Sequence, residues 1–314
     1  MGVREETGVT RALDMDPDFK EILNALGKEI TSLRGINRLP LEYKERIYAS
    51  MVPFDLGEAY GVDPATLLDR EGHKAFIFEF PEDHGILKMQ FKRSVSENDP
   101  IVFIQLSDTR YGQVNFEWVI INDPDSERFQ IHRDDSTQFI PPGSEFRNIP
   151  EEVRAMKAGL APGQVRRGLR KFREITDRVE AFLARLGIHM IHGDPYAYHN
   201  AIELERLGYF YASGREMMLE IDREFGPGGR LFKKLDASTP FRQPGMEKTI
   251  RGRSWAIHDE IMHTPWFCPA MVRLVGRKSH DYTVHDVIYV PAGPPSTSNL
   301  SSTVQYRDHG KQVE

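Results

Sequence analysis

The spacing of hydrophobic residues changes along the chain, from a helical repeat to an alternating one and back. Between residues 16 and 53, apolar side chains recur every three or four positions, as on one face of an amphipathic helix. From about residue 74 to 132 they alternate with polar residues in short runs, separated by turn-forming clusters such as PEDHG and SENDP. In ILKMQFK, for example, Leu87, Met89 and Phe91 alternate with polar residues. This region is predicted to form an antiparallel meander with one face toward water.

Helical spacing returns after residue 150. The longest apolar stripe runs from about Gln164 to Leu186 and predicts one long helix that ends at Gly187. A strand over IHMI, a helix over YHNAIELERL and a strand over YFYA follow. Further helices are predicted at REMMLEIDREF and SWAIHDEIMH, and a last strand at DVIYV. The patterns predict an α/β (α+β) fold, in which a mixed, mostly antiparallel central sheet is flanked by helices, with helical additions at both ends.

Spacing and composition together divide the chain into five segments. We expect a flexible tail over 1–15, a helical region over 16–72, an α/β core over 73–215, a C-terminal extension over 216–291 and a disordered tail over 292–314. Within the N-terminal region, helices are predicted from Asp16, over 41–51 with an end at Pro53, and from Asp63.

The overall composition narrows the class of protein. Of the 314 residues 39% are hydrophobic, which is enough to bury a substantial core. The formal net charge of -6 argues against a protein that coats nucleic acid, so no specific nucleic-acid partner is expected. Cys268 is the only cysteine, so neither an intrachain disulfide nor a Cys-rich zinc site can form. No run approaches the roughly 20 apolar residues that span a bilayer. We therefore expect a cytoplasmic protein that does not insert into membranes.

The stretch HGDPYAYHN resembles the catalytic loop of aminoglycoside- and choline-kinase-like enzymes, in which an Asp orients the substrate hydroxyl and an Asn binds magnesium. Those loops have four residues between the Asp and the Asn, whereas five separate Asp194 from Asn200. A helix is predicted after Asn200, where those enzymes continue with a strand that carries a metal-binding Asp. The sequence therefore argues against phosphoryl transfer.

A basic run, RRGLRKFR, lies at the start of the predicted long helix. Its five cations are Arg166, Arg167, Arg170, Lys171 and Arg173. Gly163 and Gly168 flank or interrupt the run and allow a ligand to approach the backbone, and a helix N-terminus with a basic rim suits an anion such as a pyrophosphate. The alternative is a solvated helix face, on which these cations pair with Glu174 and Asp177.

The elements around this run resemble the end of the GNAT acyltransferase family. In that family an Arg/Gln-x-x-Gly-x-Gly/Ala loop opens a long helix and holds the pyrophosphate of acetyl-CoA. A strand, a second helix and a closing Gly-Phe strand follow. Residues 162–212 are similar in the order and spacing of these elements, with Gly168 at the first motif glycine and Gly208-Tyr209 at the closing pair.

Four positions depart from the family pattern, one of which is Asn200, displaced from the family's usual Asn. Arg170 stands where the loop has a second small residue, and Val165 stands where it has the leading Arg or Gln. Leu204 stands where many members carry a tyrosine that protonates the departing thiolate. The resemblance therefore supports the fold more than the activity.

The resemblance implies an acyl-CoA-dependent N-acyltransferase. Its cofactor would be acetyl-CoA or another acyl-CoA, and its acceptor a small-molecule amine or a peptide; a homodimer is possible. Glu117, on a predicted strand before the motif, and Tyr198 are the candidate catalytic residues, with Glu117 as a base. The candidate cofactor-binding residues are Gly163, Gln164, Arg166, Arg167, Gly168, Arg170 and Asn200.

Two alternatives remain open beside this hypothesis. One is a non-catalytic protein of GNAT-like fold that has lost CoA binding. The other is a metal-binding enzyme, because Glu260-x-x-His263 has the spacing used in helical di-iron sites. The candidate ligands of such a metal are His192, His199, His258 and His263, although no metal is favoured.

Overall fold

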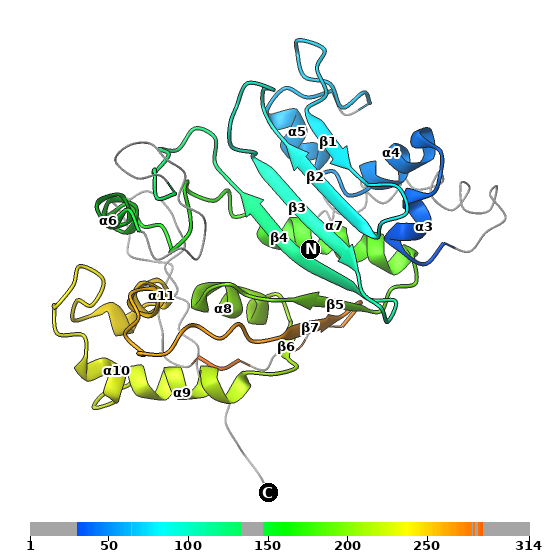
Figure 1. Ribbon diagram of the computed structural model, residues 1–314. Helices are drawn as coiled ribbons and strands as arrows, with labels where there is room; N and C mark the ends of the chain where they lie inside the picture. The colour runs from blue at the N-terminus through cyan, green and yellow to red at the C-terminus, as the bar shows by residue number, and fades with distance from the viewer. Residues whose placement is uncertain (1–29, 64, 133–146, 278, 280–281, 285–314) are drawn as a thin grey trace, which may run out of the picture. The chain divides into compact units, whose positions relative to one another are not determined.

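The computed structural model describes residues 30–63, 65–132, 147–277, 279 and 282–284 (Figure 1). The helices are α3 (Leu33–Asn37), α4 (Leu41–Ala49), α5 (Phe54–Ala59), α6 (Ile149–Lys157), α7 (Phe172–Arg185), α8 (Tyr198–Arg206), α9 (Arg215–Phe225), α10 (Arg230–Lys233), the 3-10 helix η1 (Met246–Lys248) and α11 (Ile250–His258). The strands are β1 (Phe76–Glu79), β2 (Ile86–Phe91), β3 (Val102–Asp108), β4 (Val114–Ile121), β5 (Met190–Gly193), β6 (Phe210–Tyr211) and β7 (Met271–Leu274).

The strands form one sheet in the order β1-β2-β3-β4-β5-β7-β6. The sheet is mixed but mostly antiparallel, and helices flank it, so the α+β fold class predicted from the sequence is confirmed. By its contacts the chain divides into two compact units: a first unit of residues 1–121 and 170–191, and a second unit of residues 122–169 and 192–314. The five-segment division drawn from the sequence stays a prediction.

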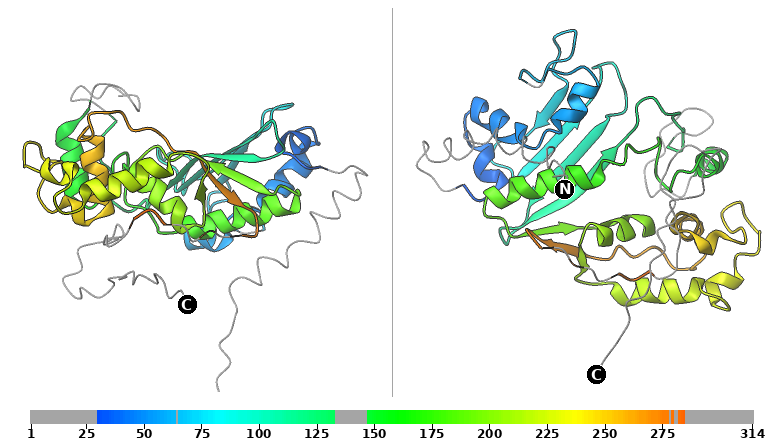
Figure 2. Two further views of the ribbon diagram at one scale, coloured as in Figure 1. Left: turned by 90° about the horizontal axis from the view of Figure 1, so that it is seen from below. Right: turned by 180° about the vertical axis from the view of Figure 1, so that it is seen from behind.

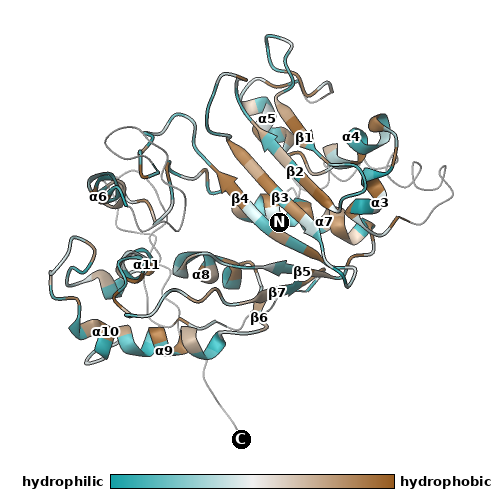
Figure 3. Ribbon diagram, in the orientation of Figure 1, coloured by the Kyte–Doolittle hydropathy of each residue, from teal (hydrophilic) through white to brown (hydrophobic). Residues whose placement is uncertain are grey.

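In the first unit, β1 to β4 form the predicted antiparallel meander. Its apolar side chains, such as Leu87, are buried on one face, while the polar side chains between them are half-exposed on the other. Helix α7 covers the buried face (Figure 2), where the ring of Phe172 lies 6.5 Å from that of Phe116 on β4. Further along α7, Phe182 packs 5.9 Å from Tyr48 of α4. Figure 3 shows how strongly hydrophobic β2, β3 and β4 are.

In the second unit, the core forms around α11. The indole Nε1 of Trp255 donates a hydrogen bond of 2.8 Å to the carbonyl of Leu160, and the Trp255 ring stacks on Phe241 at 5.1 Å. The hydroxyl of Thr249 caps α11 by accepting a bond of 2.9 Å from Gly252 N, so the helix begins four residues before the predicted SWAIHDEIMH stretch. It ends at His258, five residues before that stretch does.

The start of the long helix was predicted wrongly. Helix α7 begins at Phe172 instead of Gln164, because the intervening residues bond to another segment of the chain. The carbonyl of Val165 accepts from Phe129 N at 2.8 Å, and that of Arg167 accepts from Asp123 N at 2.7 Å. Apolar spacing alone cannot distinguish an extended segment held by such bonds from the first turns of a helix.

Three other local predictions also fail. Pro53 precedes helix α5 rather than ending one, since a proline is tolerated at a helix start. The predicted helix from Asp63 is replaced by a turn, in which the Asp63 carboxylate accepts from Ala65 N and from the hydroxyl of Thr66. The last part of the predicted meander, RFQIH at 128–132, is not a strand; its apolar residues join a small buried cluster with Leu160. The tails, most of the helix from Asp16 and the strand DVIYV lie outside the described residues.

None of the helices in the described part of the chain combines the length and the apolar composition that crossing a bilayer requires.

Candidate functional site

The pairing of β3 with β4 is interrupted by a bulge. Gln105 of β3 pairs with Trp118 of β4, whereas the next residue, Leu106, pairs with Phe116. Glu117 is therefore an extra residue, and it shares the position opposite Gln105 with Trp118. Alternation along a strand would place neighbouring side chains on opposite faces. The bulge interrupts this alternation, so Glu117 and Trp118 both lie on the half-exposed face of the meander.

Two side chains of β3 hold the carboxylate of Glu117. The amide Nε2 of Gln105 donates to Oε2 at 2.6 Å, and the hydroxyl of Ser107 donates to Oε1. Both donors lie on the half-exposed face, so their bonds fix the carboxylate on that side. Because a carboxylate offers about four acceptor positions, Glu117 retains room to accept from a ligand.

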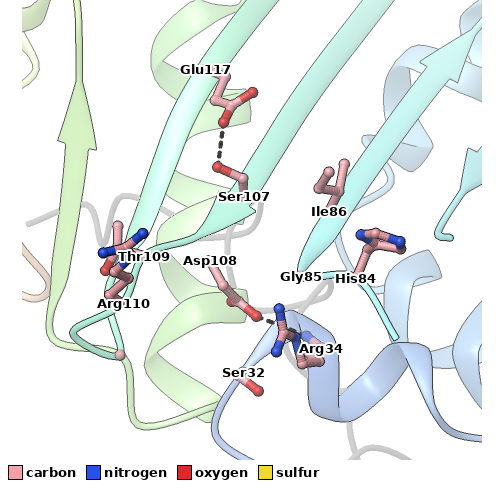
Figure 4. Close-up of a pocket in the computed structure, with 11 residues that line it drawn as sticks. Ser32, Arg34, His84, Gly85, Ile86, Ser107, Asp108, Thr109, Arg110 and Glu117 are labelled. Carbon is pink, nitrogen blue, oxygen red and sulfur yellow. Dashed lines mark hydrogen bonds between the residues drawn. The ribbon is translucent and has the colours of Figure 1, made fainter. Parts of the chain in front are cut away.

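Glu117 lines a depression in the first unit with a volume of about 600 Å³ (Figure 4). The depression lies between the start of α3, the residues before β2 and the β3–β4 hairpin. Its charged and polar lining includes Arg34, His84, Ser107, Asp108, Arg110 and Glu117. The volume is within the range of pockets that hold small molecules.

Asp108 ties helix α3 to the meander at this depression. Its Oδ1 accepts from Leu33 N at 3.0 Å and its Oδ2 from Arg34 N at 2.8 Å, which satisfies two N–H groups at the start of α3. Burial raises the pKa of Asp108, against the opposing effect of these two hydrogen bonds. The chain passes close by at Gly85, where a Cβ atom would lie 2.4 Å from the Asp108 carboxylate. A side chain at position 85 would therefore displace Asp108.

The second predicted catalytic residue, Tyr198, belongs to the other unit. It is the first residue of α8 and is 1% exposed, with its ring edge-on to Trp266 at 6.3 Å. Burial raises the pKa of the Tyr198 hydroxyl to about 12, although the charge of Arg253 opposes the shift. Asn200, also on α8, is half-buried. In the second unit Tyr198 is thus a core side chain.

The predicted cofactor loop also lies mainly in the second unit, and its groups contact their own chain. Arg167 N donates to the hydroxyl of Ser126 at 3.2 Å, and the guanidinium of Arg166 donates to the carbonyls of Pro124 and Ser126. Gln164 bonds through its Oε1 to Ala161 N at 2.8 Å. Gly163 is exposed, and Gly168 is half-buried. These residues brace a loop and do not form a helix N-terminus.

The N-terminus of the long helix lies instead at Lys171 to Phe172. Within the described residues, no side chain caps this end of α7. Arg170 directly before it has φ 61°, a left-handed conformation that glycine adopts without strain. The GNAT resemblance predicted a small residue at this position, and Arg170 has a backbone conformation typical of glycine although it carries a long side chain.

The candidate metal ligands are dispersed within the second unit. Nδ1 of His199 is 2.9 Å from the hydroxyl of Ser254, and Nε2 of His258 is 3.1 Å from the carboxylate of Glu152. Glu260 and His263 lie beyond the end of α11 with φ near 60°, so they do not share a helix face as their spacing predicted. Among the described residues there is no group of three or more His, Cys, Asp or Glu side chains that could hold a metal ion.

Several residues of the depression were not identified from the sequence. Asp108 contacts Leu33 across 75 positions of the chain, and no local pattern reports such a contact. Ser107 and Gln105 have the ordinary polar alternation of a half-exposed strand. A local signal is the polar cluster SDTRYG, which covers the end of β3 and the turn after it and is typical of a hairpin turn.

Searches of family models, curated proteins and solved structures return no match to this chain.

Proposed function

We propose that the protein is an acyl-CoA-dependent N-acyltransferase in which Glu117 is the general base. One observation carries the proposal. A β-bulge orients the half-buried carboxylate of Glu117 toward a depression, where two side chains of β3 hold it by hydrogen bonds. Bulges are over-represented beside active sites because they redirect a side chain. The succession of α7, β5, α8 and β6 is also the order of elements that the GNAT resemblance implies, although α6 lies between β4 and α7.

A base is needed because the acceptor amine binds as an ammonium ion at neutral pH. An ammonium has no lone pair, so it must lose a proton before its nitrogen can attack a carbonyl carbon. The Glu117 carboxylate can take that proton directly or through one water molecule, if the amine lies within hydrogen-bond reach. The bonds from Ser107 and Gln105 limit its rotation, and such positioning contributes to the rate.

The cofactor residues need revision within this proposal. The pyrophosphate of CoA requires N–H groups and cations that are not already used by the chain, and the 164–168 segment uses its own. The start of α7 offers such N–H groups, since no side chain caps them, although Lys171 beside it already pairs with Glu174 at 2.6 Å. When bound there, acyl-CoA supplies the thioester whose acyl group passes to the amine, with release of the CoA thiol.

The test of this function is the substitution Glu117→Gln, which keeps the shape of the side chain but removes the base. We expect kcat/KM for acetyl transfer to fall by about 10²–10⁴-fold, while the Kd for acetyl-CoA stays unchanged. Glu79→Gln is the matched control, because Glu79 is an exposed carboxylate on β1 that pairs at the surface with Lys88 and lies outside the depression. The acceptor is supplied as a panel of small amines, and CoA release is measured.

Two results would contradict the proposal. The first is the absence of any thermal stabilisation by acetyl-CoA at millimolar concentration, since ligand at ~100 times its Kd adds about 2.7 kcal/mol to the free energy of unfolding. The second is a Glu117→Gln variant with the activity of the wild type.

A second candidate function is favoured by one specific observation. The Val165–Arg167 backbone, which the family motif would turn toward the cofactor, bonds to residues 123–129. A protein of this fold that has lost CoA binding would show such a rearrangement. The acetyl-CoA titration separates this candidate from the acyltransferase.

A further inference from the structure

We propose that the depression beside Glu117 is a binding site for a small amine that also carries a carboxylate, an acceptor of the amino-acid class. This inference rests on the proposed function, because it assigns the acceptor of the same site. Two observations carry it. One is the distribution of charge in the depression, and the other is that the Asp108 carboxylate already accepts two backbone N–H groups.

Glu117 and the two arginines lie at different ends of the depression (Figure 4), and Asp108 lies beside Arg34. The carboxylate of Glu117 accepts from Gln105 and Ser107, and Asp108 follows directly after Ser107 on β3. Arg34 and Arg110 line the end near Asp108, together with His84. A ligand that contacts both ends therefore needs a cationic group toward Glu117 and an anionic group toward the two arginines.

Asp108 only partly balances these arginines, because the charge of Arg34 acts on it but one carboxylate stands against two guanidinium groups. Both carboxylate oxygens of Asp108 accept backbone N–H groups of α3, although the group lines the depression as Glu117 does. Within the described part of the chain, neither the guanidinium of Arg34 nor that of Arg110 forms a salt bridge. Two cations thus line one end of the site with their hydrogen-bond donors available.

A carboxylate is the anion that suits this end. Guanidinium groups present planar pairs of N–H donors that match the two oxygens of a carboxylate. Both arginines are exposed, so each can move to meet ligands of somewhat different length. Amine and carboxylate on one flexible molecule would engage Glu117 and the arginines at the same time.

The experiment uses the full chain and three probes of equal length, each titrated without CoA: 5-aminopentanoate, pentylamine and pentanoate. Binding is followed by calorimetry and by the fluorescence of Trp118, which is 42% exposed next to Glu117. We expect 5-aminopentanoate to bind with a Kd about tenfold or more below that of either single-charge probe. Glycine, 4-aminobutyrate and 6-aminohexanoate then give the preferred spacing between the two groups.

Three substitutions test which group of the ligand each charged residue binds. Arg34→Gln and Arg110→Gln should each raise the Kd of 5-aminopentanoate about fivefold or more and leave that of pentylamine unchanged. Glu117→Gln should weaken 5-aminopentanoate and pentylamine but not pentanoate. Arg38→Gln is the matched control, because Arg38 is an exposed arginine at the other end of α3, paired with Asp83 outside the depression. Arg110 lies in an exposed turn, so its variant stays informative if Arg34→Gln fails to fold.

The proposal is overturned if no aminocarboxylate binds at about 10 mM. It is equally overturned if pentylamine binds as tightly as 5-aminopentanoate, or if the arginine variants keep the wild-type preference. The proposed function fails separately. If aminocarboxylates bind with the expected variant pattern but acetyl-CoA does not bind, the site stands and the acyltransferase does not. If acetyl-CoA binds and transfer occurs without preference for aminocarboxylates, the acyltransferase stands and the aminocarboxylate site does not.

Discussion

The imidazole of His199 lies against α11, with its Nδ1 2.9 Å from the hydroxyl of the buried Ser254. Burial, together with the smaller effects of the charges of Arg251 and His258, lowers the pKa of His199 to about 3. The ring is therefore neutral in the folded protein at every pH at which the protein is normally handled. In the unfolded chain a histidine titrates near pH 6.5.

This difference predicts a loss of stability in acid. Between pH 6.5 and 3 the unfolded chain binds a proton that the folded one does not, so the free energy of unfolding falls as the pH is lowered through that range. The slope from this one group is at most about 1.4 kcal/mol per pH unit, and less for a ring that is only half-buried. In His199→Asn, which keeps an atom near Nδ1, the loss between pH 7 and 5 should be smaller, as measured by urea unfolding.

The exposed His189 provides the control for this comparison. His189→Asn should lose as much stability in acid as the wild type does. If His199→Asn and the wild type lose equal stability in acid, the pKa of His199 does not differ between the folded and unfolded states.

At the scale of elements, the start of α7 depends on one strained residue. Arg170 has φ 61°, and a left-handed conformation costs a residue with a Cβ atom about 1–2 kcal/mol. This conformation lets the chain leave the extended 164–168 segment and enter the helix at Phe172. The strain thus marks the boundary that hydrophobic spacing placed eight residues too early.

The strain at Arg170 can be measured by comparing the stabilities of two variants that both lose the arginine side chain. Arg170→Gly should leave the protein about 1 kcal/mol more stable than Arg170→Ala, because only glycine adopts the conformation freely. If acyl-CoA binds at the start of α7, both variants should bind it more weakly than the wild type, since both lose a cation. Chemical unfolding and acetyl-CoA titration give the two quantities separately. An alanine variant as stable as the glycine variant would mean that Arg170 is not strained.

At the scale of the whole molecule, the two units are interleaved along the chain. The chain passes from one unit to the other after residues 121, 169 and 191. Helix α7, which covers the buried face of the meander, comes from a later part of the chain than the strands. The meander thus acquires its covering helix only after a long segment of the second unit has been made.

This order predicts the behaviour of fragments. A fragment of residues 1–169 contains all four strands of the meander but exposes their apolar face, so it should show no cooperative unfolding transition. A fragment of residues 1–191 adds α7 and should regain such a transition. Circular dichroism during urea unfolding measures both. Cooperative unfolding of the shorter fragment would show that the strands and the N-terminal helices suffice.

The sequence predicted the parts of the fold in which local pattern and tertiary contact agree. Alternation identified the meander, as at Leu87, and helical spacing identified α9, because these elements bury the face that their own residues define. The start of α7 was missed, because bonds from Phe129 and Asp123 decide the conformation of residues 164–168.

For the candidate site too, the sequence predicted what local pattern shows and missed what tertiary contacts decide. Glu117 was proposed from its position on a strand before the motif, and the structure places it at the depression. The bulge that turns it there depends on the register of β3 against β4, which the spacing within β4 does not reveal. Arg34 and Asp108 could not be connected to it, since they belong to elements far apart in the chain.

The bulge has a further consequence for how this site can change over generations. Residues on either side of Glu117 pair in regular register with β3, Phe116 with Leu106 and Trp118 with Gln105. An in-frame deletion of the single codon for Glu117 would restore an uninterrupted ladder and leave every other side chain of β4 on its present face. The carboxylate is therefore a feature that one insertion can add to such a sheet and one deletion can remove, without redesign of the core beneath it.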